Sequence, residues 1–231
     1  MDFILEGLLG AVKLLLSGSG ETYSAIFTTL KVSTLSIIAS LVLGIPLGFI
    51  LGYAEFPGRR LCRTLADTLL ALPTVVVGLV VYAFLSRRGP LGELGLLFTV
   101  PGIVIGQTIL GLPIVISLTA AAIEGLDQRL RLTLLTLGAN SRQLALTSLR
   151  EGMYAVLVAA VTAYGRIISE VGVSMMLGGN IKWYTRTITT AMALETGKGE
   201  FAMGLALGMV LLAIAFTVNV LLSILKMKAE P

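Results

Sequence analysis

The chain has 231 residues but no histidine, and its only cysteine is Cys62. Without histidine it cannot form Cys–His nucleophile pairs or use histidine general bases, and most zinc sites are excluded as well. A single cysteine also rules out a disulfide within the chain. Charged residues make up 13% of the sequence, against roughly 25% in soluble domains. We therefore expect neither a catalytic centre nor a metal site.

The chain is instead rich in apolar residues, which make up 56% of it and give a mean hydropathy of +0.95. Four long runs contain no charged residue, and a fifth is interrupted only by Arg166 and Glu170. Each run reaches the ~20 residues that a spanning helix needs. The sequence thus predicts an all-α integral membrane protein with five transmembrane helices, over residues 32–54, 68–86, 94–123, 153–177 and 201–225.

The first 20 residues are apolar but interrupted by charge, and their apolar stretch is too short to span the bilayer. We predict an interfacial helix over residues 1–20, with a sixth span as the alternative. The start lacks a basic segment and a small-residue cleavage site, so no removable signal peptide is expected. Residues 1–231 are expected to form one transmembrane domain.

The distribution of lysine and arginine predicts the orientation. With five spans, nine of these residues fall on one side of the membrane and six on the other. The richer side is expected to face the cytoplasm. This places residues 124–152 and the C-terminus inside the cell, and residues 178–200 in an external loop.

Glycine and proline within the spans predict a compact bundle of kinked helices. Gly44, Gly48 and Gly52 recur at the four-residue spacing that lets two helices approach closely in lipid. Prolines interrupt helical hydrogen bonding within or at the ends of spans, at Pro46, Pro73, Pro101 and Pro113.

Residues 124–152 form a mildly polar passage between two apolar spans. Asp127 can cap a short helix over 128–137, Gly138 can end it, and Asn140 or Ser141 can cap a second helix that reaches about residue 150. A DNA-binding helix-turn-helix needs a free, basic recognition helix, whereas this passage is tethered to the membrane on both sides. The pattern predicts a knob for another protein, and a plain structured loop remains the alternative.

This passage resembles the coupling loop of ABC importer permeases, in which a central glycine matches Gly138. The family's Glu-Ala-Ala is replaced here by Leu132, Thr133 and Leu134, and Glu151 stands where the family has proline. The segments "LPTVVVGLVVYAFLSRRGPLGELGLLF" and "GRIISEVGVSMMLGGNIKWYTRTITTAMALETGKGEF" resemble the molybdate, tungstate and sulfate branch, most fully its tungstate-transport members. Most of the chain after residue 22 takes part in this similarity.

The resemblance implies the fold of a type I importer permease in the inner membrane, which pairs with a second copy of itself and contacts membrane lipid. Two separate ATPase subunits would bind the knob, and an external binding protein would deliver the oxyanion. No phosphate-binding loop occurs in the sequence, so ATP and magnesium are expected only in the ATPase, with no cofactor or nucleic acid on this chain. The expected coupling residues are Gly138, Ala139, Asn140, Ser141, Arg142, Leu144 and Ala145.

Polar and flexible residues near the fourth span are candidates for the substrate pathway. Ionisable residues within a span are costly and usually face the bundle interior, so Arg166 could favour anions while Glu170 anchors it. An ion pair that only fixes helix packing is the competing interpretation for both. The predicted pathway or gate residues are Arg166, Glu170, Ser174, Met175, Met176, Gly178, Gly179 and Asn180.

Hydroxyl groups around one cation predict a polar external vestibule at Thr185, Arg186 and Thr187. Bundle core is the competing role for the methionines, and a solvated loop for the threonines. We expect Gln107 to hydrogen-bond a neighbouring helix. The sequence as a whole predicts the permease of an ATP-driven oxyanion importer, for tungstate first, then molybdate, then sulfate. A secondary carrier or channel that works without an ATPase is the rival class.

Overall fold

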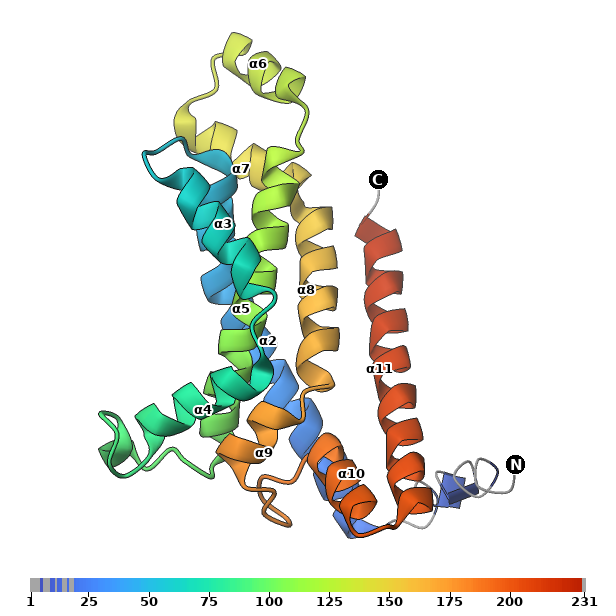
Figure 1. The fold of residues 1–231 in the computed structure, drawn as a ribbon. Coiled ribbons are helices and arrows are strands. Elements are labelled where there is room, and N and C mark those ends of the chain that lie inside the picture. The colour runs from blue at the N-terminus through green and yellow to red at the C-terminus, as the bar shows by residue number, and fades with distance from the viewer. Residues whose placement is uncertain (1–4, 6–8, 11, 14–15, 17–18, 230–231) are drawn as a thin grey trace.

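The computed structural model describes residues 5, 9–10, 12–13, 16 and 19–229, and no β-strand occurs among them (Figure 1). Most of the interfacial helix predicted over residues 1–20 lies outside these residues. The all-α prediction is confirmed. The helices are α2 (Gly20–Tyr53), α3 (Arg59–Leu69), α4 (Thr74–Leu85), the 3₁₀ helix η1 (Gly92–Leu94), α5 (Val100–Glu124), α6 (Gln128–Thr136), α7 (Ser141–Glu151), α8 (Met153–Ile168), α9 (Gly172–Gly178), α10 (Ile188–Gly197) and α11 (Phe201–Ala229).

Three described helices are long and apolar enough to cross a membrane: α2, α5 and the Phe201–Val220 part of α11. Two further spans arise if each bent helix pair counts as one: α3 with α4, bent by 101°, and α7 with α8, bent by 54°. The described residues thus allow the predicted number of five spans. Helix α2 starts at Gly20 and not at residue 32, because the polar residues before the apolar run continue the same helix.

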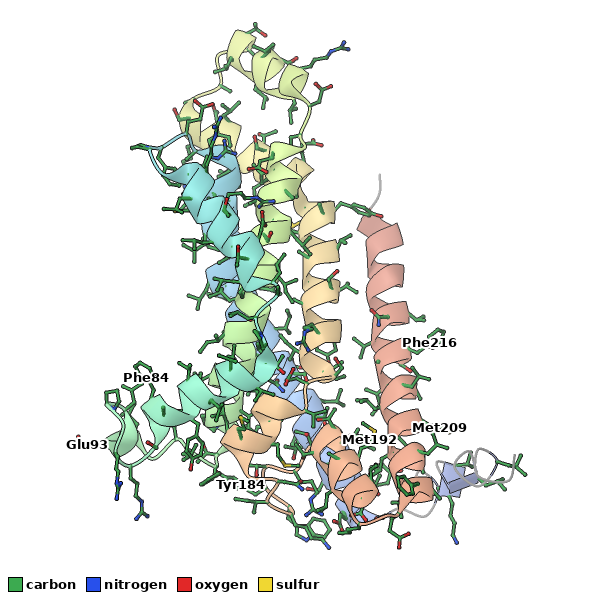
Figure 2. All side chains as sticks on the ribbon, in the orientation of Figure 1. Phe84, Glu93, Tyr184, Met192, Met209 and Phe216 are labelled. Carbon is green, nitrogen blue, oxygen red and sulfur yellow. The ribbon has the colours of Figure 1, made fainter. Side chains whose placement is uncertain are left out.

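The second span, predicted over residues 68–86, starts earlier, at Arg59, and is sharply bent before Pro73, one of the prolines expected to kink the bundle. Helix α3 ends at Leu69, and Leu70, Ala71 and Leu72 each donate to the carbonyl three residues earlier, which tightens the chain before Pro73. Proline has no N–H to donate and disfavours a helical residue before it, so a new helix starts after it. Helix α4 then leaves the bundle, and Figure 2 shows Phe84 on this projecting arm.

Two other predicted boundaries also shift. The third span starts at Val100 and not at residue 94, because Thr99 caps it by accepting from the Gly102 N–H, and Pro101 favours a first helical turn. The fourth span is broken between Ile168 and Gly172, so the predicted continuous helix over 153–177 is wrong. The predicted external loop over 178–200 contains the helix α10.

The centre of the bundle is the contact between α2 and α5, with α8 packed on both. The glycines predicted to allow close packing lie in this contact. A methyl group at Gly48 would lie 2.7 Å from both the Ile116 carbonyl oxygen and Thr119 Cβ, and one at Gly44 would lie 2.7 Å from Val115 Cγ1. The two backbones therefore approach too closely for any side chain at Gly48.

The two ends of the bundle differ. Helices α6 and α7 lie at one end, together with the α2–α3 connection (Figure 1). Helices α9 and α10 and the start of α2 lie at the other, where α4 projects sideways. Helix α11 packs on α10 and α8, and its Phe216, 70% exposed, points away from them in Figure 2.

We expect Gly48→Ala to destabilise the protein by about 1–3 kcal/mol, because the added methyl group meets α5 backbone that cannot move aside. The helical Gly165 is the matched control, since a methyl group there would meet nothing within 4 Å. Gly165→Ala should be neutral or stabilising by up to about 1 kcal/mol, because alanine favours helix. Thermal unfolding in detergent measures both, and equal melting temperatures for the two variants would contradict the close-packing argument.

Candidate functional site

The candidate site is organised around the break between α8 and α9. Glu170 lies in this break with 3% of its side chain exposed. Its Oε2 accepts from Arg166 Nη1 at 3.0 Å, and its Oε1 accepts from the backbone N–H of Val173 at 3.1 Å. The predicted contact between Arg166 and Glu170 is confirmed, but it joins the end of α8 to the start of α9 and does not lie within one helix. Glu170 thus places negative charge at a helix N-terminus, where it is stabilising.

A buried chain of polar groups extends from Glu170 across the bundle. Its carbonyl oxygen accepts from Ser174 Oγ at 3.1 Å and from Thr189 Oγ1 at 3.0 Å. Ser174 Oγ also accepts from Gln107 Nε2 at 3.0 Å, and Gln107 Oε1 accepts from Ser36 Oγ at 3.3 Å. The interhelical role expected for Gln107 is confirmed. Because a satisfied buried network specifies one arrangement, these bonds fix α2, α5, α9 and α10 around the break.

Arg166 is the partner in the pair that reaches the surface of the chain. Its side chain is 43% exposed, whereas that of Glu170 is 3% exposed. Among the described residues, its one recorded side-chain contact uses one nitrogen of a guanidinium that has five N–H donors. An arginine at membrane depth is costly against lipid and normally faces a polar cavity or another protein surface. The exposed part of Arg166 is therefore a candidate contact for a polar ligand or another protein surface.

The gate residues predicted on α9 have packing roles in this structure. Ser174 is fully buried in the polar network, and therefore does not line an open path. Met176 packs against Gly78 of α4, since a methyl group there would lie 2.7 Å from its sulfur. Gly178 packs equally closely on Ile103 of α5. Met175 is half-buried, and its role as a gate stays a prediction.

After α9 the chain turns sharply at Gly179 and Asn180, which have φ angles of +67° and +51°. The Asn180 side chain accepts from Arg186 Nε at 3.2 Å, and Arg186 also pairs with Glu21 at the start of α2. Lys182 Nζ lies 2.6 Å from the second oxygen of Glu21. This turn is therefore fixed to α2 by charge and is not a loose external loop.

The predicted vestibule is wrong for two of its three residues, because Thr185 and Thr187 are buried. Thr185 Oγ1 donates to the Gly178 carbonyl and accepts from the Ile181 N–H, which closes the turn. Thr187 caps α10 in a reciprocal capping box with Thr190. Threonine hydroxyls often replace backbone hydrogen bonds in this way, so a run of threonines need not face solvent. Arg186 is half-buried in its ion pair with Glu21.

The knob has the predicted helix–turn–helix form. Asp127 accepts from the Arg129 N–H, and Asn140 forms a capping box with Gln143, with 2.9 Å for each bond. Gly138 ends the first helical segment with a φ of +77°, which glycine adopts without strain. The second helix, α7, extends to Glu151. These boundaries confirm the predicted ones to within one residue.

The predicted coupling residues divide into two groups. Gly138, Asn140, Ser141 and Arg142 are exposed, and Ala139 is half-buried. Leu144 is 5% exposed and Ala145 half-buried, so Leu144 is packed within the chain and is not exposed to a partner as predicted. Three exposed leucines on α6 and after it were not assigned to this surface from the sequence: Leu132 (62%), Leu135 (50%) and Leu137 (77%). The sequence did contain a signal for this surface, because leucines exposed in a polar loop indicate a contact surface.

Comparison with known proteins gives consistent matches. Residues 44–229 match the family described as binding-protein-dependent transport system inner membrane component. The chain is 48% identical over 219 residues to the tungstate uptake system permease protein TupB of Campylobacter jejuni, covering 95% of this chain and 92% of that protein. It is 31% identical over 188 residues to the molybdenum transport system permease protein ModB of Escherichia coli K12, covering 77% and 82% respectively.

A solved structure shares the fold. The chain matches the inward-facing MetNI methionine ABC transporter with a TM-score of 0.75 and 16% identity, over 91% of this chain and 97% of that one. At this identity the match shows the fold alone.

We expect Glu170→Ala to lower the free energy of unfolding by about 2–4 kcal/mol, because it removes a helix cap and leaves Arg166 without its partner. Glu170→Gln should cost less, since the amide oxygen can still accept from the Val173 N–H. Glu93→Ala is the control, because Glu93 is exposed and should change stability by less than about 0.5 kcal/mol. Thermal unfolding in detergent measures the series, and a Glu170→Ala protein as stable as the Glu93→Ala control would contradict the capping role.

Proposed function

The chain belongs to the family of binding-protein-dependent transport system inner membrane components, and from this we propose that it is the permease of an ATP-driven tungstate importer. The family predicted from the coupling loop is confirmed, and the chain is a transport permease with an ABC importer fold. The assignment of tungstate as the substrate rests on the 48% identity, over nearly the whole chain, to a tungstate uptake permease. Molybdate is the next candidate, since the similarity to ModB is weaker, and sulfate follows.

We propose that the α6–α7 knob receives the force that the ATPase subunits generate. Two ATPase subunits would each bind one knob, through the exposed turn at Gly138 and the exposed leucines Leu132 and Leu135. Helix α7 is connected directly to α8, with a bend of 54°, so displacement of the knob moves α8 and the Glu170 break at its far end. The knob and the break are therefore opposite ends of one mechanical element.

The anion route is proposed to pass Arg166. Two copies of the chain would bring their exposed Arg166 side chains to a shared path, where a tetrahedral dianion needs donors and mild positive potential. Because Glu170 already pairs with one nitrogen of each guanidinium, the charge offered to the anion is reduced. Weak attraction suits a route from which the anion must leave.

We place this permease in the cytoplasmic membrane, with the α6–α7 knob and the C-terminus on the cytoplasmic side. The excess of lysine and arginine at that end supports this orientation. An external binding protein would dock at the opposite end, where α9, α10 and the charged turn lie. Exposed Trp183 and Tyr184 with Lys182 offer a contact surface there.

We expect Gly138→Pro to uncouple ATP hydrolysis from uptake, lowering tungstate uptake about tenfold or more while the protein still reaches the membrane. Proline cannot adopt the φ of +77°, and it removes the N–H that donates to the Leu135 carbonyl. Gly138→Asn is the matched control, because asparagine tolerates this conformation and keeps its N–H. Uptake and binding-protein-stimulated ATPase activity should be measured in vesicles. Normal uptake by the proline variant would refute the coupling role.

We expect vesicles with the complete importer to take up tungstate in preference to molybdate, and sulfate least. Competition between the three oxyanions, with titration of the cognate binding protein, measures this order.

Arg166→Gln should lower uptake of the preferred oxyanion about tenfold, with partial recovery in Arg166→Lys. Arg88→Gln, at an exposed site on the arm end, serves as control. Unchanged uptake by Arg166→Gln would contradict the proposed anion route past Arg166. In the competition experiment, preference for sulfate would contradict the assignment of tungstate as the substrate.

A further inference from the structure

An apolar groove runs between α2, α3 and α5, with a cavity volume of 490 Å³. Its floor is buried and includes Leu51 and Ala66, which are 6% and 7% exposed. Its walls are exposed aliphatic side chains from the same three helices: Leu47, Ile50, Leu65, Leu69 and Ile109. Lipid tails are as apolar as these walls, so the groove accepts an acyl chain but gives no preference among lipids by itself.

A second hollow of 330 Å³, with charged residues in its lining, adjoins the groove at the α2–α3 connection, and Phe56 lines both. Arg59 lines it too but is already engaged, by Glu124 at 2.8 Å and by the Leu51 carbonyl at 2.8 Å. Glu55 and Arg60 are exposed, and neither has a recorded ion pair or side-chain hydrogen bond among the described residues. One carboxylate and one guanidinium thus face the same hollow without partners.

We propose that the groove and the hollow together bind one phosphatidylethanolamine molecule, with an acyl chain between the helices and the head group at Glu55 and Arg60. A guanidinium is the side chain best suited to phosphate, since it can donate two parallel hydrogen bonds. The primary ammonium of the head group has three N–H donors for the Glu55 carboxylate. The hollow thus offers one group of each sign, as this zwitterionic head group requires.

Other phospholipids satisfy only part of this hollow. An anionic phosphatidylglycerol pairs with Arg60 but leaves the Glu55 carboxylate without a cation. A choline head group carries positive charge but no N–H that could donate to Glu55. Basic pockets between membrane helices are known to select head groups, and here the added carboxylate changes which head group fits.

The position of the site gives it a structural role. It lies at the same end of the bundle as the α6–α7 knob (Figure 1). Helix α3 is attached to α5 there by Arg63, which donates to the Ser117 carbonyl at 2.8 Å, and by Asp67, which accepts from the Ser117 hydroxyl. A lipid in the groove therefore supports α2 and α3 against α5, next to the start of the coupling loop. Its placement in the inner leaflet rests on the orientation proposed above.

Native mass spectrometry of the full-length chain, delipidated and then supplied with equal amounts of phosphatidylethanolamine and phosphatidylglycerol, tests this site. The phosphatidylethanolamine-bound species should exceed the other by about threefold or more. Glu55→Gln should abolish this preference, and Arg60→Gln should reduce binding of both lipids. Glu151→Gln, at another exposed carboxylate on the same end, is the matched control and should keep the preference.

Equal binding of the two lipids by the wild type would overturn the proposal, as would a preference that survives Glu55→Gln. Cys62 lines the groove and gives a second readout, because bound lipid should slow its modification by a maleimide at least about threefold. Oxidative cross-linking of two Cys62 side chains in membranes would show a second copy of the chain on this groove, and would also overturn it. None of these measurements uses transport, so their failure is separate from failure of the proposed import function.

Discussion

A broken helix inside a bilayer must satisfy its own free backbone groups, because lipid offers them no hydrogen bonds. At the break between α8 and α9 the Glu170 side chain meets this requirement. Its carboxylate caps the new helix, and its carbonyl oxygen accepts two hydroxyls. The polar chain through Ser174 and Gln107 then reaches α2, so one buried residue, through its carboxylate and its backbone carbonyl, helps to hold four helices together. Arg166 is held at the chain surface as a result.

The other determinant is the absence of side chains where α2 crosses α5. Glycine at positions 44, 48 and 52 brings the two backbones into contact, with carbonyl oxygens of Ile116 and Ala120 within 2.7 Å of where a methyl group would be. Close packing replaces the hydrophobic driving force that is missing between helices in lipid. The bundle is thus held by close backbone packing at the glycines and by the buried hydrogen-bond network. Spans made mostly of leucine could form neither of these.

The sequence predicted the fold class, the positions of the apolar helices and the form of the knob, because these follow from local properties. Hydropathy over ~20 residues locates spans, and the Asp127 and Asn140 caps act within three residues. It predicted a kink at Pro73 but not the 101° size of the bend, and it did not predict the break after Ile168, because hydropathy carries no information about backbone direction. It also misplaced Thr185 and Thr187, whose hydroxyls are buried because they close a local turn and cap α10. The Arg166–Glu170 pair was predicted from spacing, but the burial of one partner and the exposure of the other come from tertiary structure.

The capped knob has a consequence for recognition. Both of its helices carry their own caps, and Gly138 already has the conformation that the turn requires. A partner that grips such a preformed element spends little on ordering it, so more of the contact energy is retained as affinity. The same stiffness means that a push is delivered as displacement and is not lost in local unfolding. A flexible loop of the same composition would lose more of such a displacement in local rearrangement.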